Sequence, residues 1–237
     1  MNPPFLLVEK AISEDHAKFL YEYQKTRHKT IKELYETKEV HEHVVQGSFD
    51  PAWLSPIFYW LYGDPHFDLL MMNQLETVKE KTGEDIMPMV SLARLYKKDD
   101  ELKRHPDRGW DRKVTATVHL GHEGSHNTWP MFLQMGQGDV CQANLAVGDM
   151  LLYLGECDHW RDVCEHDYYG QVMLHYTQRG SVTPANKPVE IFDGRTHFGV
   201  PCPWLIKEKI DASNIWYIDN VHSDKQKSDH HKILSQE

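Results

Sequence analysis

The chain has 237 residues, of which 40% are hydrophobic and 26% are charged, a balance typical of a globular protein and unlike a disordered one. Lysine and arginine total 26 against 36 acidic residues, so the formal net charge of −10 argues against a protein that tracks nucleic-acid phosphates. No apolar run in the sequence is long enough to cross a membrane, and the start of the sequence leads us to expect no secretory signal. The four cysteines form no Cys-x-x-Cys pair, so we expect reduced thiols in a cytoplasmic protein.

The first third of the chain is predicted to be helical. Helices are expected over residues 13–23, 31–35, 53–61 and 67–81. Ser13 is a candidate N-cap for the first helix, Asp50-Pro51 is typical of a capped start for the third, and Gly83 would end the fourth. We assign residues 1–86 to an N-terminal helical support region within one compact domain.

From Met87 onward the apolar period changes to two residues, which indicates strands. Strands are expected over residues 87–96, 114–120, 129–134, 150–154 and 171–177, with turn-rich segments between them. Short strands without intervening helices favour an antiparallel sandwich or barrel, so the predicted fold class is mainly β (α+β). Residues 87–221 would form the β core with a C-terminal extension, and the polar residues 222–237 would form a disordered tail.

The 16 histidines include three His-x-Asp patterns, and their contexts differ. His66 stands near a predicted helix start and His222 at the edge of the polar tail, whereas His105 and Asp107 end a strand-like stretch. On an extended backbone, residues i and i+2 point to the same face, so His105 and Asp107 can reach one metal ion. His159, expected in a short loop after an apolar strand, is the candidate third ligand.

Two histidines and one carboxylate on a single face form the facial triad suited to non-haem Fe(II), with positions left open for other ligands. Zinc also accepts two nitrogens and one oxygen, usually with a bound water, so ligand type alone does not choose the metal. His119, His122 and His126 are a weaker candidate for a second metal site, because Glu123 is the only carboxylate near them in sequence.

The segment RLYKKDDELKRHPD, residues 94–107, resembles the iron-binding segment of Fe(II)/2-oxoglutarate-dependent oxygenases of the prolyl-4-hydroxylase type. Three further features follow in the same order as in that family, namely the strand at 113–120, the Gly148-Asp149 turn and the segment 171–176. The resemblance covers residues 87–179, less than half of the chain. It implies a double-stranded β-helix, which is a jelly-roll or cupin-like barrel, with supporting N-terminal helices.

By position, His105, Asp107 and His159 match the iron ligands of that family, and Tyr96 matches a tyrosine that hydrogen-bonds 2-oxoglutarate. The resemblance implies a dioxygenase that uses Fe(II), 2-oxoglutarate and O2, with ascorbate as a candidate reductant. Such an enzyme hydroxylates a small-molecule or peptide substrate and releases succinate and CO2. Two alternatives remain open: a cupin-like metal-dependent hydrolase or isomerase that needs no 2-oxoglutarate, and a non-catalytic binding module.

One departure concerns the anchor for the distal carboxylate of 2-oxoglutarate. The family usually has lysine or arginine nine or ten residues after the second histidine, where this chain has Tyr168 and Tyr169. A buried dicarboxylate still needs a cationic partner. If the chain is extended after His159, Arg161 faces the same side, and its planar guanidinium can hold a carboxylate in bidentate fashion. The other candidates are Arg94, Lys113, Gln171 and His175. A surface salt bridge is the competing interpretation of Arg161.

Overall fold

The computed structural model describes residues 5–36, 48–49, 59–107, 112–125, 127–182 and 186–195. Its elements in chain order are β1 (Phe5–Val8), α1 (Glu14–Glu36), β2 (Ser48–Phe49), β3 (Tyr59–Tyr62), α2 (Pro65–Thr82), β4 (Ile86–Lys97), β5 (Leu102–His105), β6 (Val114–Glu123), β7 (Met131–Gln134), β8 (Cys141–Ala143), β9 (Met150–Leu154), β10 (Asp158–Arg161), β11 (Tyr168–Gln178) and η1 (Ile191–Gly194). The expected tail at 222–237 and the expected helix start at Asp50-Pro51 lie outside the described residues. Within the described part of the chain, neither helix is long and apolar enough to cross a membrane.

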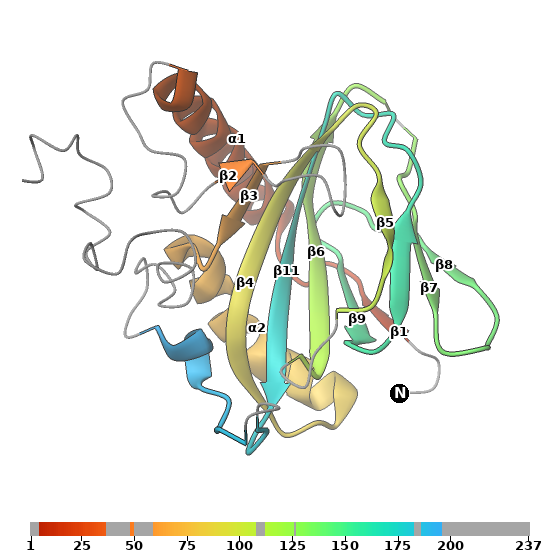
Figure 1. Cartoon of the computed structure of the whole chain (residues 1–237). Helices are drawn as coiled ribbons and strands as arrows, with labels where there is room; N and C mark the ends of the chain where they lie inside the picture. Colours follow the sequence, from red (N-terminus) through yellow and green to blue (C-terminus); the bar gives the residue numbers. More distant parts are fainter. Residues whose placement is uncertain are drawn as a thin grey trace, which may run out of the picture.

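Two antiparallel sheets form the body of the molecule (Figure 1). The major sheet has the order β1-β9-β6-β11-β4-β3-β2, and the minor sheet has the order β5-β10-β7-β8. Several neighbouring strands are distant in sequence, as in β11, which pairs with β4 on one side and with β6 on the other. This arrangement confirms the predicted double-stranded β-helix.

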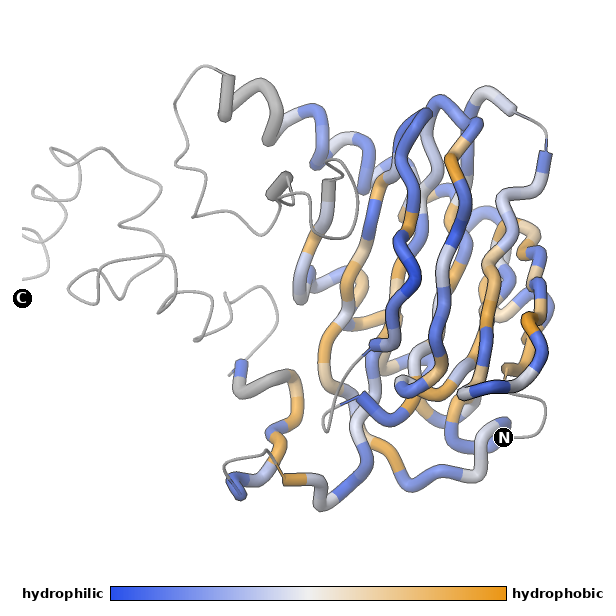
Figure 2. Tube along the Cα trace, turned by 45° about the vertical axis from the view of Figure 1, so that its right-hand side comes forward, coloured by the Kyte–Doolittle hydropathy of each residue, from blue (hydrophilic) through white to orange (hydrophobic). Residues whose placement is uncertain are grey.

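The central strands of the major sheet are buried on both faces. Along β6, Val114, Ala116 and Val118 belong to the main hydrophobic core beneath the helices. Thr115 and Thr117 alternate with them and point into the space between the sheets, where they contact polar side chains. In Figure 2, apolar (orange) and polar (blue) stretches accordingly alternate along the strands. The major sheet therefore separates an apolar core from a polar interior, and the candidate site lies in that polar interior.

Both helices cover the outer face of the major sheet (Figure 1). The sequence predicts two helices over 13–23 and 31–35, but α1 is a single helix of 23 residues. Its N-terminus is capped as expected, because the backbone N–H of His16 donates to Ser13 Oγ at 3.2 Å. The residues between the two expected helices carry no glycine or proline to end the first, so the helix continues through them.

Helix α2 confirms the helix expected over 67–81. It begins after Asp64, whose carboxylate accepts the backbone N–H of His66 at 3.0 Å, with Pro65 at the first helical position. It ends at Gly83, whose left-handed φ of 71° places its N–H on the carbonyl oxygen of Lys79. These caps fix where the chain enters and leaves the face of the sheet.

Several short strands differ from the sequence-based expectation. The sequence predicts a helix over 53–61, but residues 59–61 lie in β3 and pair with β4, while residues 53–58 are outside the described part. Strands β1 and β8, which lie at the edges of their sheets, are not predicted by the pattern. Runs of three or four residues carry too little periodicity to separate helix from strand, so their sheet partners decide their conformation. The region 1–86 thus supplies strands to the major sheet as well as helices.

A buried ion pair joins α2 to the segment after η1. Arg195 Nη1 contacts Asp68 Oδ2, and the other Asp68 oxygen accepts the Ser91 hydroxyl at 2.7 Å. The side chains of Arg195 and Asp68 are 1% and 0% exposed. Their contact spans 127 residues of sequence, so it closes the described C-terminal segment onto the helical layer.

We expect Arg195→Met to lower the free energy of unfolding by about 3–5 kcal/mol, because the Asp68 carboxylate would remain buried without its cation. Urea denaturation measures the effect, and the double variant Asp68→Asn/Arg195→Met should recover part of the loss. Arg179→Met is the control, since Arg179 is 59% exposed and pairs with Asp85 at the surface. A loss in Arg195→Met no larger than in the control would show that the buried pair does not hold this segment.

Candidate active site

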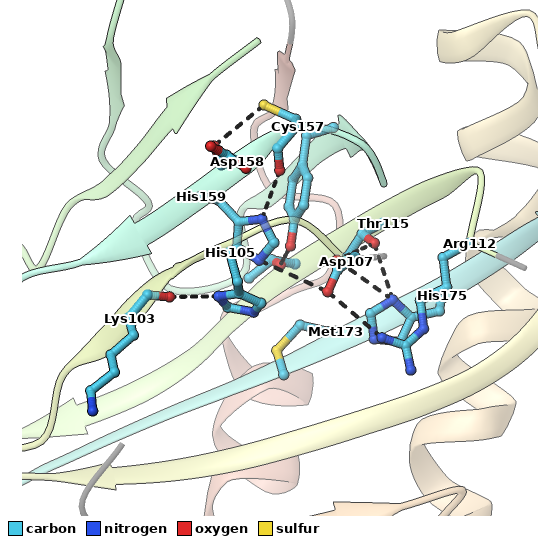
Figure 3. Close-up of polar contacts among 12 residues, drawn as sticks. Lys103, His105, Asp107, Arg112, Thr115, Cys157, Asp158, His159, Met173 and His175 are labelled. Carbon is cyan, nitrogen blue, oxygen red and sulfur yellow. Dashed lines mark hydrogen bonds and ion pairs between the residues drawn. The ribbon is translucent and has the colours of Figure 1, made fainter. Parts of the chain in front are cut away.

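Three side chains expected to bind a metal meet between the two sheets. His105 ends β5, Asp107 follows it, and His159 lies on β10, where it is the direct cross-strand partner of His105. Their ligating atoms all lie within 4.8 Å of one another, and no other group of this kind occurs among the described residues. The distance from His159 Nε2 to Asp107 Oδ1 is 3.9 Å. Figure 3 shows the three side chains pointing toward a common centre.

His159 differs in one respect from the expectation, because it lies in strand β10 and not in a loop. The antiparallel pairing of β10 with β5 explains how residues 52 positions apart in sequence, Asp107 and His159, come together. The burial pattern of β10 alternates, with His159 and Arg161 buried and the residue between them half-buried. Both side chains therefore point inward from the same strand face.

Backbone carbonyls orient both imidazoles. His105 Nδ1 lies 2.5 Å from the carbonyl oxygen of Lys103, and His159 Nδ1 lies 3.0 Å from that of Cys157 (Figure 3). A carbonyl oxygen only accepts, so each Nδ1 is the donor, and Nε2 is the ring nitrogen left to face a metal. Metal-binding histidines are commonly held by such a contact on the second ring nitrogen. The two imidazoles are thus prepared to ligate through Nε2.

The protonation states of the site also suit a metal. Burial, together with the neighbouring His159, lowers the pKa of His105 to about 4. Burial alone would raise the pKa of Asp107, but interactions with His159, His175 and Arg112 outweigh it and hold this pKa below its usual range. At neutral pH the site therefore holds a neutral His105 and an ionised Asp107, which are the forms that metal binding requires.

A hydrogen-bonded chain holds the second oxygen of Asp107. The Thr115 hydroxyl donates to Asp107 Oδ2 at 2.6 Å, and His175 Nδ1 lies 3.0 Å from Thr115 Oγ1. Because the single hydroxyl proton goes to the carboxylate, His175 Nδ1–H is the donor to Thr115. Burial, and next Arg112, lower the pKa of His175 to about 3, so its ring is neutral at pH 7. Thr115 is not predicted from the sequence, although a polar residue at an inward strand position is the signal that marks it.

We expect Thr115→Val to weaken divalent-metal binding by about 10- to 100-fold, because Asp107 loses the hydrogen bond that orients its carboxylate. Isothermal titration with Mn(II) under reducing conditions measures the dissociation constant. Thr177→Val is the matched control, since Thr177 is also a buried strand threonine and its hydroxyl has no hydrogen-bond partner within the described residues. Equal Mn(II) affinities in the two variants would exclude a role for Thr115 in orienting the Asp107 carboxylate.

A cavity of about 620 Å³ opens beside the three ligands. It is lined by Trp60, Tyr62, Leu92, Arg94, Tyr96, Leu102, Arg104, His105, Pro106, Asp107, Arg112, Met131, Tyr153, His159, Gln171, Met173 and His175. Of the four residues expected to contact the co-substrate, Tyr96, Gln171 and His175 are in this wall. Gln171 Nε2 donates to the Tyr96 hydroxyl at 3.3 Å, so β4 and β11 present these polar groups together.

Arg161, the fourth of these residues, lies next to the cavity wall and not in it. The side chain is buried, and its guanidinium packs over the rings of Trp129 and Tyr169 at 4.8 and 5.1 Å. Nη1 donates to the Trp129 carbonyl oxygen, while Nε and Nη2 have no hydrogen-bond partner among the described residues. Tyr96 joins the two regions, because it lines the cavity and its ring lies 5.0 Å from that of Trp129. The surface salt bridge considered from the sequence is not formed within the described part of the chain.

Two of the histidines considered for a second metal site, His119 and His122, stack on the ring of Tyr169, over which Arg161 also packs. His119 Nδ1 contacts the Leu145 carbonyl oxygen at 3.0 Å, and His119 Nε2 contacts His122 Nδ1 at 3.3 Å. Both nitrogens of His119 are thus engaged, and this pair does not belong to any metal-ligand group found among the described residues. His126 is outside the described residues.

No family model matches the sequence, and no curated protein matches it. Solved structures do match the fold. A prolyl-4-hydroxylase from Pseudomonas putida has a TM-score of 0.55 at 17% identity, over 75% of this chain and 94% of that one. HygX from Streptomyces hygroscopicus, solved with nickel and 2-oxoglutarate bound, has a TM-score of 0.53 at 14% identity, over 76% and 84%.

A third match comes from a virus. The viral collagen prolyl hydroxylase from Paramecium Bursaria Chlorella virus-1, solved as a 2-oxoglutarate complex, has a TM-score of 0.51 at 10% identity, over 74% of this chain and 96% of that one. Identities this low establish the fold alone. The chain therefore has the double-stranded β-helix fold of the 2-oxoglutarate- and Fe(II)-dependent oxygenases to which it is similar in structure.

Proposed function

We propose that the protein is a non-haem Fe(II)- and 2-oxoglutarate-dependent dioxygenase that hydroxylates an organic substrate and releases succinate and CO2. The observation that carries the proposal is the convergence of His105, Asp107 and His159 beside a cavity in a double-stranded β-helix. The similarity in fold to oxygenases solved with a metal and 2-oxoglutarate supports it.

The donor set fits Fe(II). Two imidazole Nε2 atoms and one carboxylate on a single face leave positions open for a chelating co-substrate and for O2. Bound Fe(II) and 2-oxoglutarate would supply the oxygen-activating redox chemistry that side chains lack. The chain's own residues hold the ligand geometry, and the apolar wall formed by Leu92, Met131 and Met173 restricts water around it.

Arg161 would hold the distal carboxylate of 2-oxoglutarate. It lies two residues after His159 on β10, which places it about 6.6 Å further along the strand, a span that a five-carbon dicarboxylate can bridge. Its Nε and Nη2 atoms form one edge of the guanidinium, and these two atoms have no hydrogen-bond partner in the described residues. That edge is the one that grips a carboxylate with two parallel hydrogen bonds.

The neighbours of Arg161 account for the unusual tyrosine at position 169. The sequence has Tyr169 where the family pattern usually has a cation, and the guanidinium of Arg161 packs over that tyrosine ring. Arg161 of β10 would thus bring a positive charge to the place where, in the family pattern, a cation at position 168 or 169 brings it. Tyr96 and Gln171 would bind the co-substrate between this cation and the metal.

An anaerobic titration tests the proposal. Purified protein should bind one equivalent of Fe(II), and addition of 2-oxoglutarate should then give a visible charge-transfer absorption band. Admission of O2 should convert 2-oxoglutarate to succinate, slowly without substrate. A stoichiometric metal site with no 2-oxoglutarate band would instead indicate the cupin-like hydrolase or isomerase. Absence of stoichiometric metal binding would leave only the non-catalytic binding module.

A further inference from the structure

A methionine occupies the middle of the inner face of the major sheet. Met173 lies on β11, the central strand, with Gln171 and His175 on either side of it along the same strand face. Its direct cross-strand partners are Thr117 of β6 and Leu92 of β4. Met173 lines the cavity, so its side chain stands on the wall that faces the minor sheet, from which the two candidate histidine ligands project.

This methionine lies close to the candidate metal site. His175, two residues further along β11, has its Nδ1 atom 3.8 Å from Asp107 Oδ2. In the view of Figure 3, the thioether of Met173 lies between the side chains of His105 and His175, and all three residues line the same cavity. The sulfur of Met173 therefore belongs to the immediate surroundings of the three proposed ligands.

The sulfur of Met173 is held in position without being packed into a hydrophobic core. Gln171 Nε2 donates a hydrogen bond to Met173 Sδ at 3.3 Å. A thioether sulfur has two lone pairs and is a weak acceptor, so one such contact leaves the second pair available. Met173 belongs to none of the hydrophobic clusters of the described residues. Met131, another methionine of the cavity wall, packs instead with Leu133 and Leu151 in such a cluster. Of these two thioethers, Met173 is the one presented to the cavity.

A thioether in this position competes with the substrate of an oxygenase. Methionine is polarisable and is readily oxidised to its sulfoxide. The sulfur accepts an oxygen atom directly, whereas oxidation of an aliphatic or aromatic carbon of the wall also requires a bond to hydrogen to be broken. When no substrate fills the cavity, the thioether is therefore the group of the wall that takes up an oxygen atom most easily.

We propose that Met173 is a self-oxidation site, whose thioether is converted to the sulfoxide when 2-oxoglutarate is turned over in the absence of substrate. Decarboxylation of 2-oxoglutarate breaks the bond between its keto and adjacent carboxylate carbons and supplies two electrons. The sulfur lone pair supplies two more, and the O–O bond of O2 breaks. One oxygen atom enters succinate, the other forms the S–O bond, and CO2 is released with no net transfer of protons. This inference rests on the proposed function, because the reaction needs Fe(II), 2-oxoglutarate and O2.

Oxidation of Met173 would change the wall of the site. The thioether forms, with Leu92 and Met131, the apolar part of the wall, and the sulfoxide is polar and chiral. A polar group at this place admits water and disturbs the packing opposite the ligands. Turnover without substrate should therefore slow as the sulfoxide accumulates, so an enzyme molecule that consumes 2-oxoglutarate without making product silences itself.

The test compares Met173 with a methionine that is more open to solvent. Met173 is 6% exposed, whereas Met72 on α2 is 37% exposed. The full chain is incubated with Fe(II), 2-oxoglutarate and O2 in the presence of catalase, and its tryptic peptides are analysed by tandem mass spectrometry. Residues 162–179 form one peptide, in which Met173 is the only methionine. We expect Met173 to gain one oxygen atom at least about tenfold faster than Met72, because a group held beside the reacting centre has a high effective concentration.

Controls separate this reaction from oxidation by a diffusing oxidant. Hydrogen peroxide added to the metal-free protein should oxidise Met72 before Met173, because exposure then sets the order. Omission of 2-oxoglutarate or of O2 should leave Met173 reduced. Met173→Leu keeps an apolar side chain of similar volume and should abolish the gain of oxygen in the 162–179 peptide. Met72→Leu removes a methionine at the surface and should leave that gain unchanged.

The outcomes separate this inference from the function on which it rests. If succinate forms while Met173 stays reduced, the inference is wrong and the oxygenase stands. The same conclusion follows if Met72 is oxidised as fast as Met173, or if peroxide alone oxidises Met173 first, because a diffusing oxidant then explains the product. If the 162–179 peptide still gains oxygen in Met173→Leu, another side chain is the target and the inference fails. If wild-type protein gives neither the 2-oxoglutarate band nor succinate, the proposed function is overturned and this inference falls with it.

Discussion

Asp107→Ala should abolish stoichiometric Fe(II) binding and lower the rate of 2-oxoglutarate turnover by more than about 100-fold. Losing only a hydrogen-bond partner of a metal ligand already costs up to about 100-fold, and here the ligand itself is lost. Asp107 is the only anionic ligand of the described group, so its removal leaves two neutral imidazoles to hold a dication. The same change leaves Arg112 without the carboxylate at 3.9 Å, which raises the positive potential where the metal would bind. Metal analysis after gel filtration and succinate release under ascorbate measure the two effects.

Asp107→Asn separates loss of charge from loss of shape. The amide oxygen can still accept the Thr115 hydroxyl, so the fold and the hydrogen-bonded chain to His175 should persist. Metal affinity should nevertheless fall almost as far as in the alanine variant, because a neutral amide is a poor ligand for Fe(II). Asp85→Asn, a surface carboxylate that is 70% exposed, is the control. Turnover in both Asp107 variants equal to that of the control would remove the proposed metal site.

The metal ligands could be predicted because part of the site is local in sequence. His105 and Asp107 are two positions apart, and an extended backbone turns such residues to one face without any knowledge of the rest of the fold. His159 is found by its place after an apolar strand in the family order. The sequence predicts a loop at His159, whereas the structure has the four-residue strand β10 there. A run this short carries no clear period, and its extended form depends on pairing with β5 and β7.

The rest of the site depends on cross-strand register, which the sequence does not contain. Thr115 meets His175 because β6 and β11 are paired at that position, and the two residues are 60 apart in the chain. Arg94 and Arg112 converge on the cavity from β4 and from the segment before β6. In the sequence they are single arginines within an alternating strand and a charged turn, and only the folded sheet makes them a pair.

Arg161→Met should raise the dissociation constant of 2-oxoglutarate by at least about 100-fold while leaving Fe(II) binding intact. A carboxylate that loses its buried cationic partner is destabilised by about 3–5 kcal/mol, and every 1.4 kcal/mol corresponds to a factor of ten. The charge-transfer band gives the dissociation constant directly. Arg161→Lys keeps the charge but loses the two-pronged edge formed by Nε and Nη2, so its affinity should fall between those of wild type and Arg161→Met.

The stability of the ligand-free protein decides whether Arg161 serves a ligand or the fold. Arg161 and Arg195 are both buried arginines, but Arg195 pairs with Asp68, whereas Arg161 has no such carboxylate within the described residues. Replacing an uncompensated buried cation by an apolar side chain should leave the melting temperature unchanged or raise it, the reverse of the loss expected for Arg195→Met. When the 2-oxoglutarate concentration is 100 times its dissociation constant, the free energy of unfolding of the wild-type protein should rise by about 2.7 kcal/mol. Arg161→Met should lose nearly all of this gain. The contrary result is that Arg161→Met destabilises the ligand-free protein as strongly as Arg195→Met. The guanidinium would then stabilise the fold by packing against Trp129 and Tyr169, and another cation would have to hold the co-substrate.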